Sequence, residues 1–288
     1  MNDIFPLYVD GNNEPHKGDG ELLHFTSAKS FFKILEDLTL LPSMFTNLND
    51  LNEGNVHNMD MNKNFPAMYD ADKYIKEKCR VLCFSQNYDI NGFGFSGVNH
   101  PAMWGHYADN SNGVCIAIDK KAFIAKNRDI LGKYFSKFED VKYKTINTPR
   151  DSEIDYSPTT AEEFIKQNWE GLFFLKHEDW QNEDEHRLFI MDYDGKFSID
   201  GCIRYIVLGR KFFSDKKQLK KLMNKIVNPN SFVYKKFYPQ SFATTNYSPY
   251  GYTMHSVAFR IHEIVRNSCR QNKHYRDYYE WCKKVSGN

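Results

Sequence analysis

Two apolar runs decide the fold class, RVLCFS at residues 80–85 and GVCIAID at residues 113–119. Both are short, rich in apolar side chains, and flanked by polar or glycine-containing segments, which is typical of buried strands. Further strand-like runs lie on either side of them, at residues 22–26, 40–46, 141–143, 187–192, 203–208 and 232–238. The chain is therefore expected to form a sheet from strands that are far apart in the sequence.

Helical patterns alternate with these strands. Ser27 is a suitable N-cap for a helix over residues 28–38, in which Phe31, Ile34 and Leu35 recur at helical spacing. Further helices are expected at residues 70–78, 101–108, 121–137, 161–176 and 215–227, and as one or two segments within 253–285. Short strands interleaved with helices at irregular spacing predict an α+β fold, with a mixed, mostly antiparallel sheet and flanking helices.

The sequence also predicts three regions. Residues 1–20 are rich in Gly, Asn and Asp and are expected to form a flexible N-terminal arm. Residues 21–242 are expected to form the α+β core domain. The polar segment ATTNYSPYG at residues 243–251 marks the expected start of a basic C-terminal helical extension over residues 243–288.

The overall composition is that of an ordinary soluble protein, with 41% hydrophobic and 26% charged residues in 288. No apolar run approaches the roughly 18 residues that a membrane helix needs, and the N-terminus lacks the pattern of a secretory signal. We therefore expect a cytoplasmic protein with no membrane association. Six cysteines without a CxxC pair predict free thiols, so neither a disulfide framework nor a metal is expected.

Charge is distributed unevenly along the chain. Residues 201–288 contain 17 basic and 4 acidic residues, whereas residues 1–200 contain 21 basic and 33 acidic residues. The basic side chains of the C-terminal region include Lys216, Lys217, Lys220, Lys221, Lys225, Arg260, Arg266, Arg270, Lys273 and Arg276. This pattern predicts either a solvated basic face or binding of an acidic partner such as nucleic acid. The oligomeric state is not indicated.

Common catalytic motifs are missing from the sequence. It contains no GxxxxGK[ST] phosphate loop, no GxSxG and no HExxH. The segment GFGFSG at residues 92–97 has the glycine spacing of a dinucleotide-binding loop, but neither the helix nor the acidic residue expected after it follows. Functional residues are therefore sought in three smaller clusters.

Two of these clusters combine imidazole, hydroxyl and aromatic groups. His24 and Thr26 lie two positions apart on an expected strand, so their side chains share a face and could grip one ligand. The alternative is a strand-end histidine that bonds to backbone. Trp104, His106 and Tyr107 follow the glycine-rich loop and form either a stacking wall for a planar ring or part of the core.

The third cluster lies before a strand near residue 187. Glu183, Glu185 and Arg187 alternate, so an extended backbone would place them on one face. Two carboxylates beside a guanidinium are expensive to bury unless they are paired or used in a site. On a solvated strand edge the same residues would need no functional explanation.

The order of short motifs resembles a bacterial family known as domain of unknown function 2971. These motifs are His24-Phe25-Thr26, Asn49 to Glu53, Cys83-Phe84-Ser85, Met103 to Ala108, Gly113-Val114-Cys115 and Trp180 to Arg187. The resemblance covers residues 22–240, and six motifs in the same order make it specific. The family name implies no activity.

A more distant similarity is to ADP-ribosyltransferases, which carry a His or Arg on an opening strand, a hydroxyl residue on a middle strand and a catalytic Glu on a late strand. The matching positions here are His24, Ser85 and Glu185, with Glu183 upstream of the catalytic Glu. This resemblance implies that NAD is a co-substrate and that Glu185 stabilises an oxocarbenium-like transition state. His24 and Thr26 would hold a ribose.

The remaining parts of NAD are assigned in the same way. The resemblance implies that Trp104 or Tyr107 stacks on nicotinamide, with His106 beside them, and that Arg187 or Arg80 binds the pyrophosphate. The leading hypothesis is thus an ADP-ribosyltransferase-like, NAD-consuming enzyme, as a bacterial toxin or antiviral defence effector.

Two other functions stay open. One is a non-catalytic nucleic-acid or nucleotide-binding sensor of a defence system, whose binding would weaken in salt. The other is a metal-independent nuclease that uses His24, His106 or His177 with Glu185 as acid and base.

Overall fold

The computed structural model describes residues 20–50, 53, 66–90, 93–95, 97–145, 153–209, 211–212, 242–248 and 251–256. The expected N-terminal arm, the helix over residues 215–227, the strand over residues 232–238 and the chain beyond residue 256 lie outside the described residues, apart from Gly20. Within the described part, no helix is both long and apolar enough to cross a membrane.

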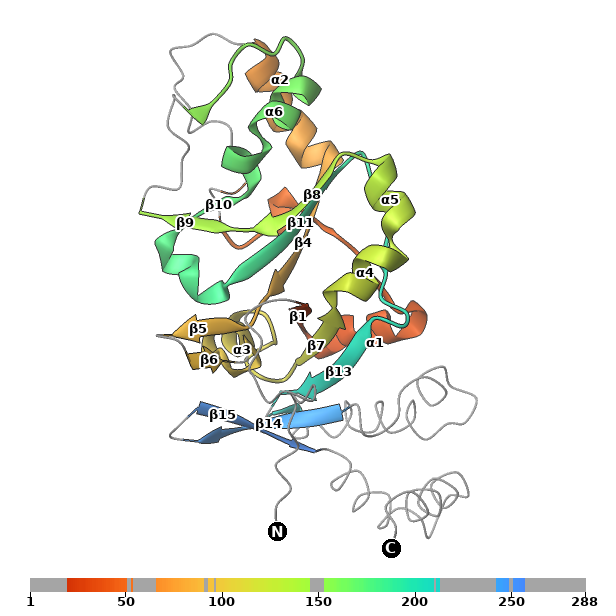
Figure 1. Ribbon diagram of the computed structural model, residues 1–288, viewed down its shortest axis with the longest axis vertical. Helices are drawn as coiled ribbons and strands as arrows, with labels where there is room; N and C mark the ends of the chain where they lie inside the picture. The colour runs from red at the N-terminus through yellow and green to blue at the C-terminus, as the bar shows by residue number, and fades with distance from the viewer. Residues whose placement is uncertain are drawn as a thin grey trace, which may run out of the picture.

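A large, mostly antiparallel sheet organises the chain (Figure 1). Its strands are β1 (Glu21–Thr26), β4 (Cys79–Ser85), β7 (Val114–Asp119), β8 (Ser136–Asp140), β11 (Glu185–Met191), β13 (Ile203–Leu208), β14 (Phe242–Ser248) and β15 (Gly251–Ser256). They run in the order β15-β14-β13-β7-β1-β4-β11-β8, and β3 (Ser43–Met44) also pairs with β4. Only β13 and β14 are parallel along this path. The predicted α+β fold is confirmed.

Three small sheets and the helices complete the described elements. The small sheets pair β2 (Thr39–Leu40) with β12 (Phe197–Ser198), β5 (Tyr88–Ile90) with β6 (Phe93–Phe95), and β9 (Lys142–Lys144) with β10 (Leu175–His177). The α-helices are α1 (Ala28–Asp37), α2 (Pro66–Lys78), α3 (Pro101–His106), α4 (Lys120–Lys126), α5 (Arg128–Lys133) and α6 (Ala161–Phe173). Short 3-10 helices are η1 (Phe45–Asn47), η3 (Gly97–Asn99) and η5 (Glu178–Glu183). Ser27 caps α1 as predicted, accepting a hydrogen bond from the backbone N–H of Ser30.

Some predicted helices and loops are wrong. The single helix expected over residues 121–137 is divided into α4, α5 and the start of β8. Asn127 sits at the break, where its amide nitrogen donates to Ser198 O at 2.9 Å and its amide oxygen accepts from Ser198 N at 2.9 Å. This pairing with a distant strand competes with helix continuation. The loop expected over residues 86–99 contains the β5–β6 hairpin, and the helix expected to reach residue 176 ends at Phe173.

The C-terminal prediction also needs correction. Residues 242–248 and 251–256 are strands that extend the main sheet beyond β13, so the helix expected from residue 253 is wrong for residues 253–256. Alternating polar and apolar residues in YTMHS, at 252–256, fit a strand better than a helix. These two strands adjoin the core sheet through β13 rather than forming a separate helical unit.

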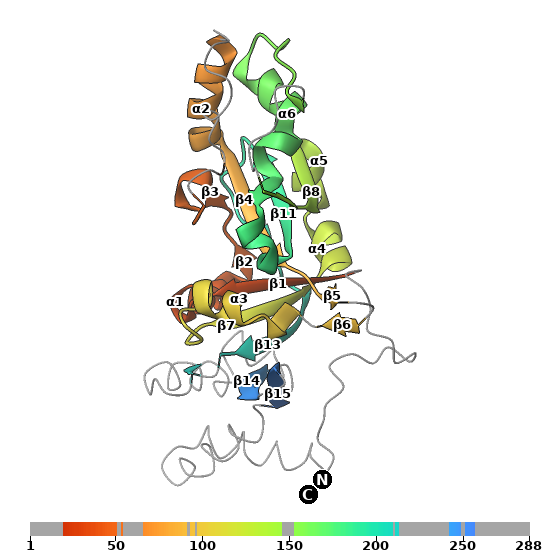
Figure 2. The same ribbon diagram turned by 90° about the vertical axis from the view of Figure 1, so that its left-hand side faces the viewer.

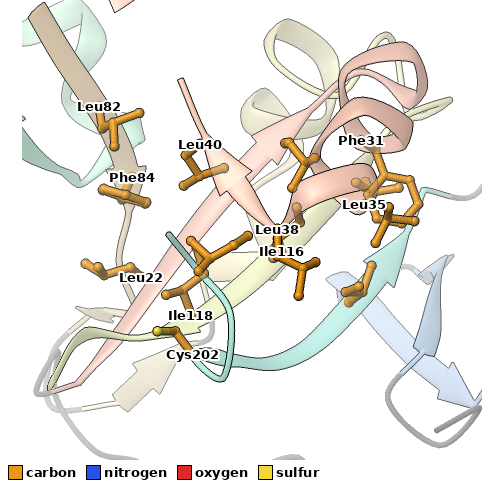
Figure 3. Packing of buried hydrophobic residues seen from close by; sticks show 14 of the residues in the cluster. Leu22, Phe31, Leu35, Leu38, Leu40, Leu82, Phe84, Ile116, Ile118 and Cys202 are labelled. Carbon is orange, nitrogen blue, oxygen red and sulfur yellow. The ribbon is translucent and has the colours of Figure 1, made fainter. Parts of the chain in front are cut away.

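Alternation along the strands distributes apolar side chains to three buried clusters. Helices α1, α4 and α5 cover one face of the sheet, and Phe31, Leu35 and Ile116 lie in that cluster (Figure 3). On the opposite face, α2 and α6 cover β4 and β11, while α3 covers β1 and β7. The sheet is thus buried on both faces, and polar side chains on its central strands require a specific explanation.

The sheet opens between β1 and β4. Strand β1 makes six register pairs with β7, and β4 makes seven with β11, but β1 and β4 share only the pair Leu23–Ser85. Further along β4, its neighbour on that side is β3, which pairs at Val81 and Arg80. Figure 2 shows β1 running across the view while β4 and β11 run along it. The diverging strands leave part of the edge of β4 uncovered by either neighbour.

Candidate functional site

A cavity of about 750 Å³ lies where β1 and β4 diverge. Its volume falls in the range of small-molecule binding sites. It is lined by β1 and the following helix α1, by β4, by the segment after β3, and by residues of α3, β10, η5 and β11. Side chains from both faces of the sheet therefore reach one cavity.

His24 and Thr26, which lie two positions apart on β1, both line the cavity. The Nδ1 atom of His24 lies 3.4 Å from the carbonyl oxygen of Cys83, across the gap between the strands. Burial lowers the pKa of His24, an effect only partly opposed by this hydrogen bond, so the imidazole is held in its neutral form. The structure therefore combines both alternatives for His24, since it bonds to backbone and also lines the cavity.

Glu185 and Arg187, on β11, also line the cavity. They lie two positions apart on β11 and point to the same face, as predicted. Arg187 donates from Nε to Glu185 Oε1 at 2.6 Å and from Nη2 to Glu185 Oε2 at 2.9 Å, which is a bidentate pair. Both side chains are almost fully buried, with 1% of Arg187 and 3% of Glu185 exposed.

Glu183 reaches the same cavity by a different route from the one predicted. It ends η5 instead of belonging to the strand, so the expected alternation over residues 183–187 is wrong at its first member. Asp184, with a φ of 41°, adopts the left-handed conformation between η5 and β11. This turn brings Glu183 beside Glu185, and Lys176 bridges their carboxylates.

The sequence analysis missed Lys176 and gave no role to Glu53. Lys176 Nζ, on β10, lies 3.0 Å from Glu53 Oε1, 2.6 Å from Glu183 Oε2 and 3.1 Å from Glu185 Oε2. Glu53 Oε2 also lies 2.7 Å from Arg187 Nη2. Glu53 is the last residue of the Asn49-to-Glu53 motif, so this motif could have indicated that Glu53 belongs to the site. Nothing in the sequence around Lys176 distinguishes it from a surface lysine.

These five residues form one buried network of three carboxylates and two cations within the described part of the chain. Burial alone would lower the pKa of Lys176, but the three carboxylates raise it above its ordinary value. Burial alone would likewise raise the pKa of Glu185, but Arg187 and Lys176 lower it to about 2. Burial raises the pKa of Glu183, and the attraction of Lys176 offsets this only in part. The paired carboxylates therefore differ in their affinity for a proton.

The other predicted ligand residues are placed as follows. Ser85 lines the cavity, and its hydroxyl donates to the backbone carbonyl oxygen of Glu183 at 2.6 Å. Tyr107 lines the cavity and donates a short hydrogen bond to Glu183 Oε1. His106 is exposed and also lines the cavity, with its ring centroid 6.5 Å from that of Trp180.

Two predicted ligand roles do not fit the structure. Trp104 is fully buried, donates from Nε1 to Val98 O at 2.6 Å and packs edge-on against Phe25, so it belongs to the core and does not form a stacking wall. Arg187 uses its guanidinium on Glu185, Glu53 and the carbonyl oxygen of Phe173, so it is not available for a pyrophosphate. Arg80, the alternative, does not line the cavity.

Metal ligands and cysteine thiols are the remaining groups that could carry chemistry in the described residues. Among the residues that the structure describes, no group of three or more His, Cys, Asp or Glu residues is placed to hold a metal ion. The cysteines Cys79, Cys83, Cys115 and Cys202 are free thiols. Cys83 lines the cavity, and burial raises the pKa of its thiol well above the ordinary value. It therefore carries a neutral thiol.

The fold and site thus define an α+β protein with a cavity at an open sheet and a buried ionic network in its wall. Residues 103–188 match the model of a family described as protein of unknown function (DUF2971). The matched segment contains Tyr107, Lys176, Glu183, Glu185 and Arg187, although not the β1 side of the cavity. No curated protein and no solved structure matches the chain significantly.

Proposed function

We propose that this protein cleaves the bond between nicotinamide and ribose in NAD and transfers the ADP-ribosyl group to an acceptor or to water. The observation that supports the proposal most directly is the buried carboxylate network in the cavity wall. Buried ionic groups are costly, and strongly perturbed carboxylates in a cavity are typical of functional sites.

Glu185 would supply a fixed negative charge. The reaction develops positive charge on the ribose ring, and a carboxylate that stays ionised stabilises that charge without first losing a proton. Arg187 and Lys176 keep Glu185 ionised by lowering its pKa to about 2. Both oxygens of Glu185 already contact Arg187 or Lys176. Glu185 would therefore stabilise the positive charge without touching the ribose, or replace one of these contacts with a contact to the ribose.

Other residues that line the cavity are chemically suited to bind the ribose and the pyrophosphate of NAD. The neutral His24 and the hydroxyl of Thr26 would bind a ribose. Ser27, Ser30 and Lys33 line the cavity along the first turns of α1. Hydroxyls, a lysine and a helix N-terminus favour phosphate oxygens, so this end would hold the pyrophosphate in place of Arg187.

The test measures nicotinamide released when the full chain is incubated with NAD. We expect release by the natural protein and a decrease on the order of a hundredfold in Glu185→Gln, as for loss of one electrostatic stabiliser. Glu139→Gln is the matched control, because Glu139 is an exposed residue of the edge strand β8 and does not line the cavity. It should keep the natural rate. Absence of release, or equal rates for Glu185→Gln and the natural protein, would contradict the proposal.

The second candidate is a nucleotide-binding sensor without catalysis. It is favoured by one observation, namely that the contacts of Glu185 with Arg187 and Lys176 would also suit a purely structural network. This candidate predicts that NAD or ADP-ribose binds without release of nicotinamide. For the nuclease alternative, His24 and His106 line the cavity with Glu185, whereas His177 does not. The basic C-terminal residues proposed to bind nucleic acid lie outside the described residues.

A further inference from the structure

The buried network contains one more carboxylate than cations. Its members Glu53, Glu183, Glu185, Lys176 and Arg187 each have at most 9% of the side chain exposed. An unbalanced charge in such surroundings is costly, and a buried carboxylate avoids the cost by holding a proton. The geometry identifies which of the three carboxylates does so.

The partners of Glu183 differ from those of the other two carboxylates. Glu185 contacts Arg187 through both oxygens and also Lys176. Glu53 contacts Lys176 through one oxygen and Arg187 through the other. Glu183 contacts Lys176 through Oε2, whereas its Oε1 accepts a hydrogen bond from the neutral hydroxyl of Tyr107. Of the three, Glu183 is therefore the one that contacts a cation through only one of its oxygens.

Tyr107 is tied to the end of α3 by its backbone. It follows α3 directly, and its backbone N–H donates to Met103 O at 3.0 Å. The neighbouring Trp104 is anchored in the core through Val98. Burial raises the pKa of Tyr107, and the adjacent Glu183 raises it further, so the phenol stays protonated and remains a hydrogen-bond donor.

We propose that Glu183 is the carboxylate that exchanges a proton with bound substrate, and that Tyr107 is the positioning residue that holds its Oε1 and stabilises its ionised form. The proposal deepens the proposed function and relies on it for the chemical step. In that step the bond between ribose C1′ and the nicotinamide nitrogen breaks, and its electron pair stays on that nitrogen. A hydroxyl or water oxygen bonds to C1′, and its proton passes to Glu183.

The proton on Glu183 can be measured without any activity. Infrared titration of the full chain should show a protonated carboxyl group that persists above pH 4.5, the ordinary glutamate pKa. This signal should be absent from Glu183→Gln. Because the Tyr107 hydroxyl favours the ionised carboxylate, Tyr107→Phe should move the titration upward by about one pH unit.

Tyr74→Phe is the matched control, because Tyr74 donates to Asp192 at 2.6 Å and does not line the cavity. It should leave the titration of Glu183 unchanged. The inference is overturned if no Glu183-dependent signal remains above pH 4.5, or if Tyr107→Phe titrates like Tyr74→Phe.

The pH dependence of nicotinamide release is an independent test of the role of Glu183. The rate of nicotinamide release should rise with pH as Glu183 ionises, and Tyr107→Phe should shift that rise upward by the same interval. If the natural protein releases no nicotinamide, the proposed function fails, while the infrared titration still decides where the proton resides.

Discussion

Two lysines on neighbouring strands form ion pairs in opposite surroundings, one exposed to solvent and one buried. Lys142 on β9 pairs with Glu170, and both side chains are more than half exposed. Lys176 on β10, whose register partner on β9 is Tyr143, contacts three carboxylates with only 5% of its side chain exposed. Exposed pairs gain little because water screens them, whereas a buried network must recover a large desolvation cost.

The comparison indicates where function resides. The pair Lys142–Glu170 needs no explanation beyond a solvated surface. The network around Lys176 adjoins a cavity, and its carboxylates differ in pKa direction. Replacing it by apolar side chains would often be neutral or stabilising in other proteins, so its presence here points to a role other than stability.

The largest expected effect is on stability when Lys176 is removed. Lys176→Met leaves three carboxylates with Arg187 as their remaining cation in the network, and breaking a buried network of this kind costs about 3–5 kcal/mol. The free energy of unfolding in urea measures this loss. Lys142→Met, the exposed counterpart, should cost less than about 1 kcal/mol.

A second substitution sharpens this test. Adding Glu53→Gln to Lys176→Met removes a carboxylate that has lost its contact with Lys176, so it should restore part of the lost stability. Equal costs for Lys176→Met and Lys142→Met would show that burial does not distinguish the two lysines.

The parts of the site set by strand alternation were predictable from the sequence. His24 with Thr26, and Glu185 with Arg187, share a face because each pair lies two positions apart on a strand. The ionic network was not predictable, because Lys176 and Glu53 meet only through long-range packing.

The fold shows the same division between local and long-range signals. The buried strand at residues 80–85 and the cap at Ser27 follow from local pattern, and both are confirmed. The break at Asn127 depends on Ser198, which is far along the chain. The gap between β1 and β4 depends on how β1 and β3 share one edge of β4, which no local pattern encodes.

A substitution at Trp104 separates the core from the cavity wall. Trp104→Phe removes the hydrogen bond to the buried carbonyl oxygen of Val98 and leaves a small void, at a cost of about 2–3 kcal/mol. Because Trp104 does not line the cavity, binding of NAD by the folded variant should be unchanged. Urea unfolding and calorimetric titration with NAD measure the two effects. Weakened binding with unchanged stability would restore the stacking role that the sequence suggested.

The last expected effect, no larger than the one at Trp104, is a pH dependence that belongs to Glu185. Its pKa of about 2 in the folded protein lies below the ordinary 4.5, so its contribution to stability is complete above pH 4.5 and is lost as the pH falls toward 2. The stability advantage of the natural protein over Glu185→Gln should therefore shrink by roughly 2–3 kcal/mol over that interval. Asp37, Asp119 and Asp140 also have lowered pKa values, but they are present in both proteins and cancel in the difference. Urea unfolding of both proteins at a series of pH values measures this difference. An advantage that stays constant across the interval would mean that Arg187 and Lys176 do not hold Glu185 in its ionised form, and the buried network would then be no different electrostatically from the exposed pair at Lys142.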